Sequence, residues 1–185
     1  MAGALSGKRI AFLVANEGVE QVELAETWQA VEQDAGRPVL LAPEPGIVQA
    51  YQSRDRAAKF PVHQTVEEAS VDDYAGLVLP GGVVSADQLR LKAGAVALVR
   101  EFVDAGKPVA AICHAAWTLV EAGAVRGKTL TSYPSLRTDL VNAGATWVDE
   151  AVHVDGSAGW TLVSSRTPDD LPEFCREACR AFAAA

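Results

Sequence analysis

The regular alternation of short apolar runs with helix-length amphipathic segments is the feature that most restricts how this chain can fold. Near-continuous apolar runs of this length are typical of strands covered on both faces. They occupy Arg9–Ala15, Pro38–Ala42, Tyr74–Pro80 and Pro108–Ile112. Segments with helical spacing of apolar residues follow at 20–35, 93–105, 113–122, 134–142 and 168–184. Strands that alternate with helices predict an α/β fold with a mostly parallel sheet.

The rest of the chain gives weaker signals. Residues 47–63, bounded by prolines and a glycine, predict either a hairpin or an irregular excursion. Residues 128–132 are strand-like, and residues 147–154 and 160–164 predict strands around a turn at Asp155-Gly156. Without a linker or an internal repeat, we expect a single domain over residues 1–185.

Composition limits the function classes. Apolar residues make up 49% and charged residues 22% of the 185 residues, which is typical of an ordered globular protein. The net charge of −8 repels phosphate backbones, so a nucleic acid is not an expected partner. No apolar run reaches the roughly 18 residues of a membrane span, and the start of the chain lacks a secretory signal. We therefore expect a cytoplasmic protein, in which three cysteines form no disulfide framework.

Chemically useful residues follow three of the expected strands. They lie in Asn16–Glu23, Pro80–Gly82 and Ala111–Ala115. Sites in parallel sheets form where the carboxyl ends of the strands meet. The sequence therefore predicts that these segments share one edge of the sheet.

Cys113 is the sharpest candidate among these residues. It stands between a buried strand and the start of a helix, which is the position of a nucleophile elbow. Free N–H groups and the helix dipole at such a position lower a thiol pKa from its usual value of about 8.5. The alternative is a small buried cysteine that only packs in the core.

The other candidates have equally plain alternatives. Backbone amides at Gly81 and Gly82 can hold an oxyanion, or the pair can be a simple turn. Glu20 and Glu23 lie in the first turn of a helix; one can assist a thiolate only if burial keeps it protonated near neutral pH. His114 follows Cys113, but on a helix its side chain points about 100° away.

Several further patterns indicate structure rather than chemistry. His153 and Asp155 share one face of a strand and are expected to be structural. Gly127-Lys128-Thr129 lacks the earlier glycine of a phosphate loop. Cys175 and Cys179 stand four apart on the last helix without a nearby histidine, so we expect core packing and no metal site.

The sequence resembles the PfpI family of intracellular cysteine proteases, in the superfamily of the parkinsonism-associated protein deglycase. The resemblance extends over nearly the whole chain, in the order of the family. The matching segments are Gly18–Leu24, Leu77–Gly82, Gly106–His114, Thr131–Glu150 and Val163–Phe174. The resemblance implies a flavodoxin-like three-layer sandwich around the sheet, with a strand-to-helix nucleophile elbow.

The resemblance also implies roles for individual residues. Cys113 matches the reactive cysteine, Glu23 the buried acid that hydrogen-bonds it, and His114 the histidine that follows the nucleophile. Asp87 matches an acid that reaches His114 from a neighbouring subunit, which implies a homodimer or homohexamer. Gly81, Gly82, Glu20 and Ala115 fall at the substrate-binding positions. The family needs no metal or organic cofactor.

Three functions remain open from the sequence. The first is a cofactor-independent cysteine enzyme of the stress response that acts on reactive carbonyls, as a glyoxalase or deglycase, or on peptides. The second is a redox-sensing protective protein whose Cys113 oxidises to sulfenic or sulfinic acid. The third is a binding domain with an inert cysteine.

Overall fold

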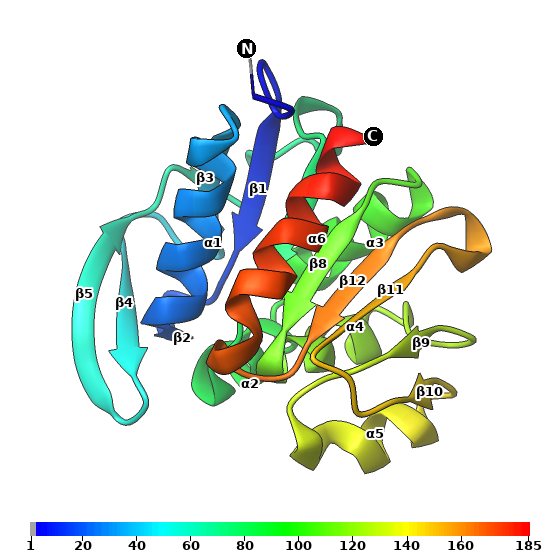
Figure 1. The fold of residues 1–185 in the computed structure, drawn as a ribbon. Helices are drawn as coiled ribbons and strands as arrows, with labels where there is room; N and C mark the ends of the chain where they lie inside the picture. Colours follow the sequence, from blue (N-terminus) through cyan, green and yellow to red (C-terminus); the bar gives the residue numbers. More distant parts are fainter. Residues whose placement is uncertain (1–2) are drawn as a thin grey trace.

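A seven-stranded sheet forms the centre of the molecule (Figure 1). The computed structural model describes residues 3–185. The strands lie in the order β11–β12–β8–β7–β1–β3–β6, and every neighbouring pair is parallel except β11 with β12. Their bounds are β1 Arg9–Leu13, β3 Arg37–Ala42, β6 Gln64–Thr65, β7 Gly76–Leu79, β8 Val109–Ile112, β11 Val152–Asp155 and β12 Leu162–Ser165.

Helices cover both faces of this sheet and complete three layers (Figure 1). On one face, α1 (Gln21–Gln33) and α6 (Leu171–Ala183) pack on Ile10 and Phe12 of β1. On the other, α3 (Ala93–Asp104) and α4 (Ala116–Glu121) pack on Ala11 and Leu13. Successive side chains of a strand point to opposite faces, so a continuous apolar run fills both cores. The predicted flavodoxin-like three-layer fold is confirmed.

Residues 47–63 form a hairpin that stands away from the central sheet (Figure 1). Its strands are β4 (Ile47–Gln52) and β5 (Asp55–Pro61), and β4 pairs in parallel with β2 (Glu17–Glu20). The sequence allowed either a hairpin or an irregular excursion over these residues. It did not predict β2, which has only four residues, two of them charged. This small sheet places the hairpin turn above the start of α1.

The prediction of one strand over residues 147–154 is wrong. The structure divides it into β10 (Thr146–Trp147), which pairs with β9 (Thr129–Leu130), and β11, which pairs with β12. Between them Asp149 accepts a hydrogen bond of 2.8 Å from Arg166, and the chain passes from one sheet to the other. The antiparallel pair β11–β12 around the turn after Asp155 is confirmed.

The remaining elements are short. They are α2 (Val83–Leu89), which the sequence did not predict, α5 (Arg137–Asn142), and single 3-10 turns at Val71–Asp73, Cys113–Ala115, Pro134–Leu136, Ser157–Gly159 and Pro168–Asp170. In the part of the chain from residue 3 onwards, none of the helices has both the length and the apolar character that a bilayer crossing requires.

Candidate active site

Cys113 lies at a sharp turn directly after β8. Its φ of 63° is in the left-handed region, which a residue with a side chain rarely adopts. The neighbouring β7 ends just before Gly81 and Gly82, and the two strands are hydrogen-bonded in parallel. The predicted elbow is therefore present, and the strained backbone holds the thiol at the carboxyl edge of the sheet.

A cavity of about 680 Å³ opens beside Cys113. Its walls come from the β1–α1 segment, the hairpin turn, the start of α2, the elbow and the loop before α5. The lining residues are Gly18, Glu20, Glu23, Tyr51, Ser53, Arg54, Gly82, Val83, Val84, Cys113, His114, Tyr133 and Pro168. A volume of this size accommodates a small molecule or a short part of a larger one.

His114 contacts the thiol in spite of its position next to Cys113 in the chain. Its Nδ1 lies 3.2 Å from Cys113 Sγ, because the turn at residues 113–115 is not a regular α-helix. The ring stacks on Tyr133 at 4.5 Å between centroids. Burial lowers the pKa of His114, so the neutral imidazole is the form present at neutral pH. A neutral ring at this distance can accept the thiol proton.

Glu23 is a fully buried acid beside the elbow. Its Oε2 accepts a 2.7 Å hydrogen bond from the Gly81 N–H, and its Oε1 is buried without a hydrogen-bond partner among the described residues. Burial raises the pKa of Glu23 to about 7, although the Gly81 N–H and the Cys113 thiol act in the opposite direction. Glu23 is therefore desolvated enough to hold a proton near neutral pH, as an acid partner of a thiolate requires.

The protonation of Cys113 depends on that of Glu23. Burial raises the pKa of the Cys113 thiol, and an ionised Glu23 raises it further, whereas the N–H groups of His114 and Gly82 lower it. The expectation that the turn lowers the thiol pKa is wrong, because burial, followed by the charge of Glu23, outweighs the two N–H groups. The helix that follows has only six residues, too few to offset desolvation and a nearby negative charge.

The backbone amides of Gly81 and Gly82 face different side chains. A Cβ on Gly81 would lie 2.6 Å from Glu23 Oε2 and 2.7 Å from Cys113 Cβ, so only glycine leaves room for both side chains. Because the Gly81 amide is bonded to Glu23, the amide of Gly82 is the one that faces the thiol. Gly82 has a φ of 96°, and its added Cβ would lie 2.7 Å from Glu20 N.

The structure brings some of the remaining candidates to the cavity and leaves others outside it. Glu20 lines the cavity and accepts a 3.1 Å hydrogen bond from Ser53 N. Ala115 instead packs in the core on the α3–α4 face, away from the cavity lining. Asp87 lies on α2, half exposed, and pairs with Arg90 of its own chain at 2.7 Å.

The sequence patterns did not indicate four polar or aromatic residues of the cavity lining. Tyr51, Ser53 and Arg54 come from the hairpin turn, and Tyr133 comes from the loop before α5. No local pattern marks the hairpin residues, because they reach the site only through the pairing of β2 with β4. Tyr133 stood within a segment that carried the family resemblance, but its aromatic ring gave no chemical signal of its own.

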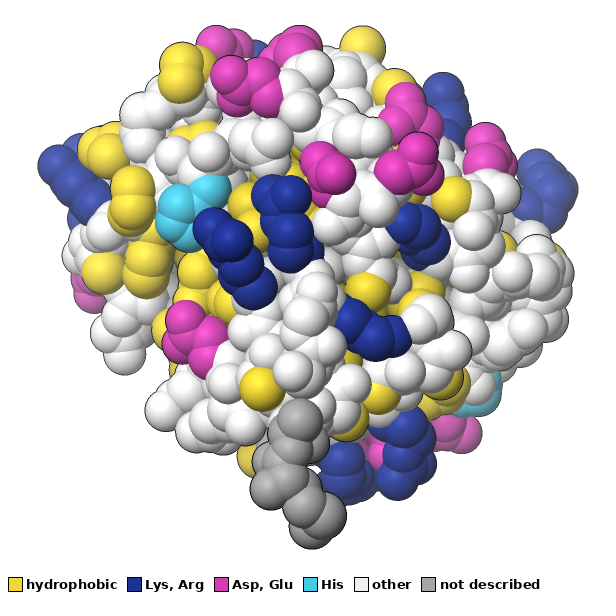
Figure 2. Space-filling model, turned by 90° about the horizontal axis from the view of Figure 1, so that it is seen from above, with side chains coloured by type: hydrophobic (Ala, Val, Ile, Leu, Met, Phe, Trp, Pro, Cys, Tyr) yellow, Lys and Arg dark blue, Asp and Glu magenta, His cyan; other side chains and the backbone are white. Residues whose placement is uncertain are grey.

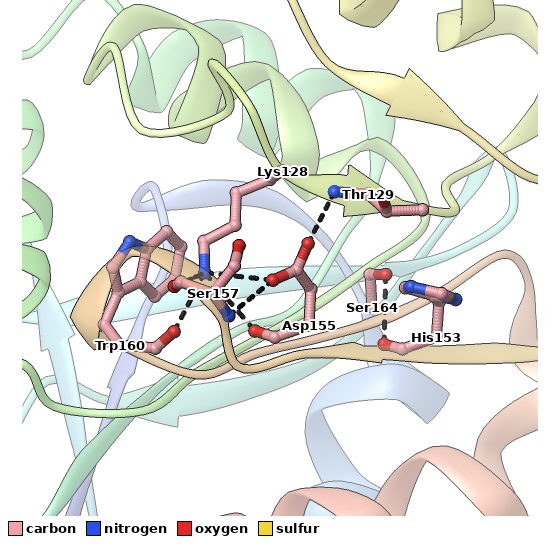
Figure 3. Close-up of polar contacts among 7 residues, drawn as sticks. All are labelled: Lys128, Thr129, His153, Asp155, Ser157, Trp160 and Ser164. Atoms are coloured by element: carbon pink, nitrogen blue, oxygen red, sulfur yellow. Dashed lines mark hydrogen bonds and ion pairs between the residues drawn. The ribbon is translucent and has the colours of Figure 1, made fainter.

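A second polar cluster lies away from the cavity, around Lys128 (Figure 3). The Lys128 side chain is 1% exposed and its Nζ lies 3.4 Å from Asp155 Oδ1. Nζ also donates to the backbone oxygens of Ser157 at 2.6 Å and Trp160 at 2.8 Å. His153 pairs separately with Glu150, so His153 and Asp155 do not form a pair with each other. Lys128 and Asp155 hold the β11–β12 connection against β9.

The other two cysteines belong to helix packing. Cys175 and Cys179 are half-buried on α6, and all three cysteines are free thiols. The Cys175 thiol lies 3.7 Å from Thr27 Oγ1 on α1, so its contacts are those of the helix interface. Across residues 3–185, no group of three His, Cys, Asp or Glu side chains is arranged to hold a metal ion.

The three-layer sheet and the elbow cysteine beside a buried glutamate define a class of protein. The model of the DJ-1/PfpI family matches residues 8–181, and the chain belongs to this family.

Individual proteins of known sequence are similar to this chain. The chain is 37% identical to Deglycase PH1704 of Pyrococcus horikoshii over 169 residues, 91% of this chain and 96% of that protein. It is 36% identical to General stress protein 18 of Bacillus subtilis over 171 residues, 92% and 95% of the two chains. A match with an Archaeoglobus fulgidus protein reaches 49% identity over 113 residues, 61% of this chain and 64% of that protein.

Solved structures agree with the assignment. Drosophila melanogaster DJ-1beta superposes with a TM-score of 0.84 at 27% sequence identity, over 96% of this chain and 91% of that chain.

Proposed function

We propose that this protein is a cofactor-independent cysteine enzyme of the glyoxalase or deglycase type, which acts on small reactive carbonyls through a Cys113 thiolate. The observation that carries the proposal is the Cys113 thiol at a strained elbow, 3.2 Å from a neutral His114 and beside the buried acid Glu23. The name of the Pyrococcus relative, a deglycase, supports the same class.

The first chemical step follows from this arrangement. The thiol proton moves to His114 Nδ1 or to the carboxylate of an ionised Glu23, and sulfur forms a bond to the aldehyde carbon. The carbonyl π bond breaks, its electron pair goes to oxygen, and the oxygen takes up a proton to give a hemithioacetal. The Gly82 N–H, which faces the thiol, is suited to stabilise the developing oxyanion.

Subsequent turnover of methylglyoxal to lactate needs no external oxidant. A proton leaves the former aldehyde carbon and a proton is added at the neighbouring carbon, which gives a thioester at the same overall oxidation level. Water then hydrolyses the thioester and regenerates the thiol. Neutral His114 is suited to these proton transfers because burial lowers its pKa and its ring is held by Tyr133. Peptide hydrolysis by the same thiol is less favoured, because a small aldehyde suits this cavity better than a polypeptide does.

Replacement of the thiol tests the proposal. We expect Cys113→Ala to abolish lactate formation from methylglyoxal, while Cys175→Ala, which removes a half-buried thiol from α6, retains wild-type turnover. His114→Ala should lower kcat by about 100-fold or more, the usual contribution of a general base. Unchanged turnover in purified Cys113→Ala would eliminate the proposal.

A second function, redox sensing, is favoured by one observation. Cys175 and Cys179 lie on α6 and all three cysteines are free thiols, so Cys113 forms no disulfide with a resolving cysteine. Peroxide would transfer one oxygen to the Cys113 thiolate and leave as water after protonation, which gives a sulfenic acid. The Bacillus relative named a general stress protein supports a protective role. Mass spectrometry after mild peroxide treatment should find Cys113 oxidised before Cys175 and Cys179.

We further propose that the active enzyme is a homodimer or homohexamer in which Asp87 of one subunit reaches His114 of another. Asp87 is half exposed on α2, the helix that supplies Val83 and Val84 to the cavity. Within one chain, Asp87 is held by Arg90, whose guanidinium in turn lies 4.8 Å from the Trp117 ring centroid.

A further inference from the structure

A second, basic pocket lies at the opposite end of the central sheet from Cys113. It has a volume of about 470 Å³ and is lined by Arg9, Arg37, Pro38, Val39, His63 and Gln64. Arg9 and Arg37 begin β1 and β3, whereas Cys113 follows the carboxyl end of β8. Figure 2 looks onto this end of the molecule and shows Lys and Arg side chains grouped beside a histidine.

The register of the sheet places the two arginines side by side. Arg9 pairs with Arg37 in the parallel β1–β3 ladder, so both side chains leave the same face of the sheet. Neighbouring strands are about 4.8 Å apart. Two like charges directly opposite each other on a sheet repel, which an anion bound between them would relieve.

The two guanidinium groups differ in their counter-charges. Arg9 forms a long ion pair, with Nη1 3.8 Å from Asp73 Oδ2, and its Nε is buried without a hydrogen-bond partner among the described residues. Across residues 3–185, Arg37 has no carboxylate within 4.0 Å. The Arg9 guanidinium lies 4.9 Å from the Tyr74 ring centroid, a cation–π contact that restricts its position. In a chain with a net charge of −8, two such arginines in one pocket are unexpected.

His63 also lines this pocket. Its Nδ1 accepts a 2.9 Å hydrogen bond from Leu40 N, and its ring lies 5.6 Å from the Trp28 ring centroid. Gln64 is already engaged, because its Oε1 accepts from the Tyr74 hydroxyl at 2.6 Å. The lining thus holds two arginines and no carboxylate, and the nearest carboxylate to Arg9 is that of Asp73 at 3.8 Å.

We propose that this pocket binds the phosphate group of a small phosphorylated molecule. Arg37, which has no carboxylate within 4.0 Å among the described residues, and Arg9, whose ion pair with Asp73 is long, attract a phosphate anion, and guanidinium N–H groups bond its oxygens in a paired geometry. The pocket volume is in the range of small-ligand sites. The site is independent of the chemistry at Cys113, because none of its lining residues lines the cavity there.

Calorimetric titration of the full chain at low salt tests this proposal, with inorganic phosphate and glycerol 3-phosphate as probes. We expect saturable binding of one phosphate group per chain. Arg37→Gln, an exposed position, should weaken binding at least tenfold and leave methylglyoxal turnover unchanged. The matched control is Lys59→Gln, which removes one positive charge from the exposed face of β5 outside the pocket.

The outcomes separate the possible ligands. Tighter binding of glycerol 3-phosphate than of inorganic phosphate identifies a phosphate ester as the ligand; equal binding identifies free phosphate. Absence of saturable binding for both probes, or equal weakening by Arg37→Gln and Lys59→Gln, would overturn the proposal. Arg9→Gln is a second variant whose fold is checked by circular dichroism, because Arg9 also packs on Tyr74.

Discussion

At the scale of single residues, Glu23 and Cys113 form a pair that cannot comfortably hold two negative charges. Glu23 is fully buried and Cys113 is 8% exposed, so water screens their repulsion weakly. The thiolate is therefore favoured when Glu23 keeps its proton, and each loss of a proton belongs to the pair rather than to one group.

This coupling predicts how the reactivity of Cys113 depends on pH. Near pH 7, where Glu23 titrates, the pair loses its first proton and a fraction of the thiol becomes reactive. The rest of the thiol should react only at alkaline pH, because an ionised Glu23 raises the thiol pKa. Iodoacetamide alkylation followed by mass spectrometry should thus show two steps. Glu23→Gln, which carries no charge, should show one.

Glu20→Gln is the matched control for that experiment. Glu20 lines the same cavity but is hydrogen-bonded to Ser53 N rather than buried against the thiol. The control should retain the two-step profile. A single step in the wild type, superimposable on that of Glu23→Gln, would show that the two groups titrate independently.

At the scale of elements, the sequence could predict those whose stability depends on local pattern. The apolar runs of β1, β3, β7 and β8 and the spacing of α3 and α6 were sufficient for the sheet and its two helical layers. The carboxyl-end rule for parallel strands then placed Cys113, Glu23 and Gly82 at one edge. Elements stabilised by tertiary contacts, such as β2 and α2, have no comparable pattern and were not predicted.

The same distinction applies to the site. Contact between Cys113 and His114 depends on a φ of 63° at Cys113, which no helical geometry would suggest. Tyr51 and Arg54 line the cavity only because the hairpin packs beside the elbow, and nothing in the hairpin sequence specifies that packing. Composition and spacing therefore predict the edge where the site forms, but not its full lining.

The buried ion pair of Lys128 gives a prediction about the β9, β11 and β12 elements. Burial lowers the pKa of Lys128, whereas hydrogen bonds from Ser157 and Thr129 and the Lys128 charge keep the pKa of Asp155 well below its usual value in spite of burial. Lys128→Met leaves Asp155 without its counter-charge, so we expect a loss of roughly 3–5 kcal/mol in the free energy of unfolding. Urea denaturation measures it.

Arg126→Met controls for the loss of one positive charge in the same loop. Arg126 is exposed and takes part in no ion pair with the described residues, so its removal should change the free energy of unfolding by less than about 0.5 kcal/mol. Equal effects of the two substitutions would mean that the Lys128–Asp155 pair contributes nothing beyond surface charge.

At the scale of the whole molecule, exposed apolar side chains stand on α2 and just after it, and two of them line the cavity. Val83 is 51% and Val84 48% exposed on α2, and Leu91 just beyond it is 79% exposed. An apolar surface next to a site whose acid, Asp87, is expected to act across subunits favours self-association there.

We therefore expect light scattering with size-exclusion chromatography to give a dimer or hexamer. Leu91→Asp should shift the protein toward monomers and lower methylglyoxal turnover, because the charge would have to be buried in the interface. Lys59→Asp, a charge change on the hairpin, should leave assembly and turnover intact. A fully active wild-type monomer would contradict both the assembly and the role of Asp87 across subunits.

The surroundings of Lys128 have a further consequence. Oxygens of Asp155, Ser157 and Trp160 gather around its ammonium, which also lies 4.2 Å from the Trp160 ring centroid. This resembles the coordination shell that a protein builds around a potassium ion, except that the cation is tethered to the chain by its own side chain. The loop consequently carries a cation that dialysis cannot remove, because that cation is covalently part of the chain.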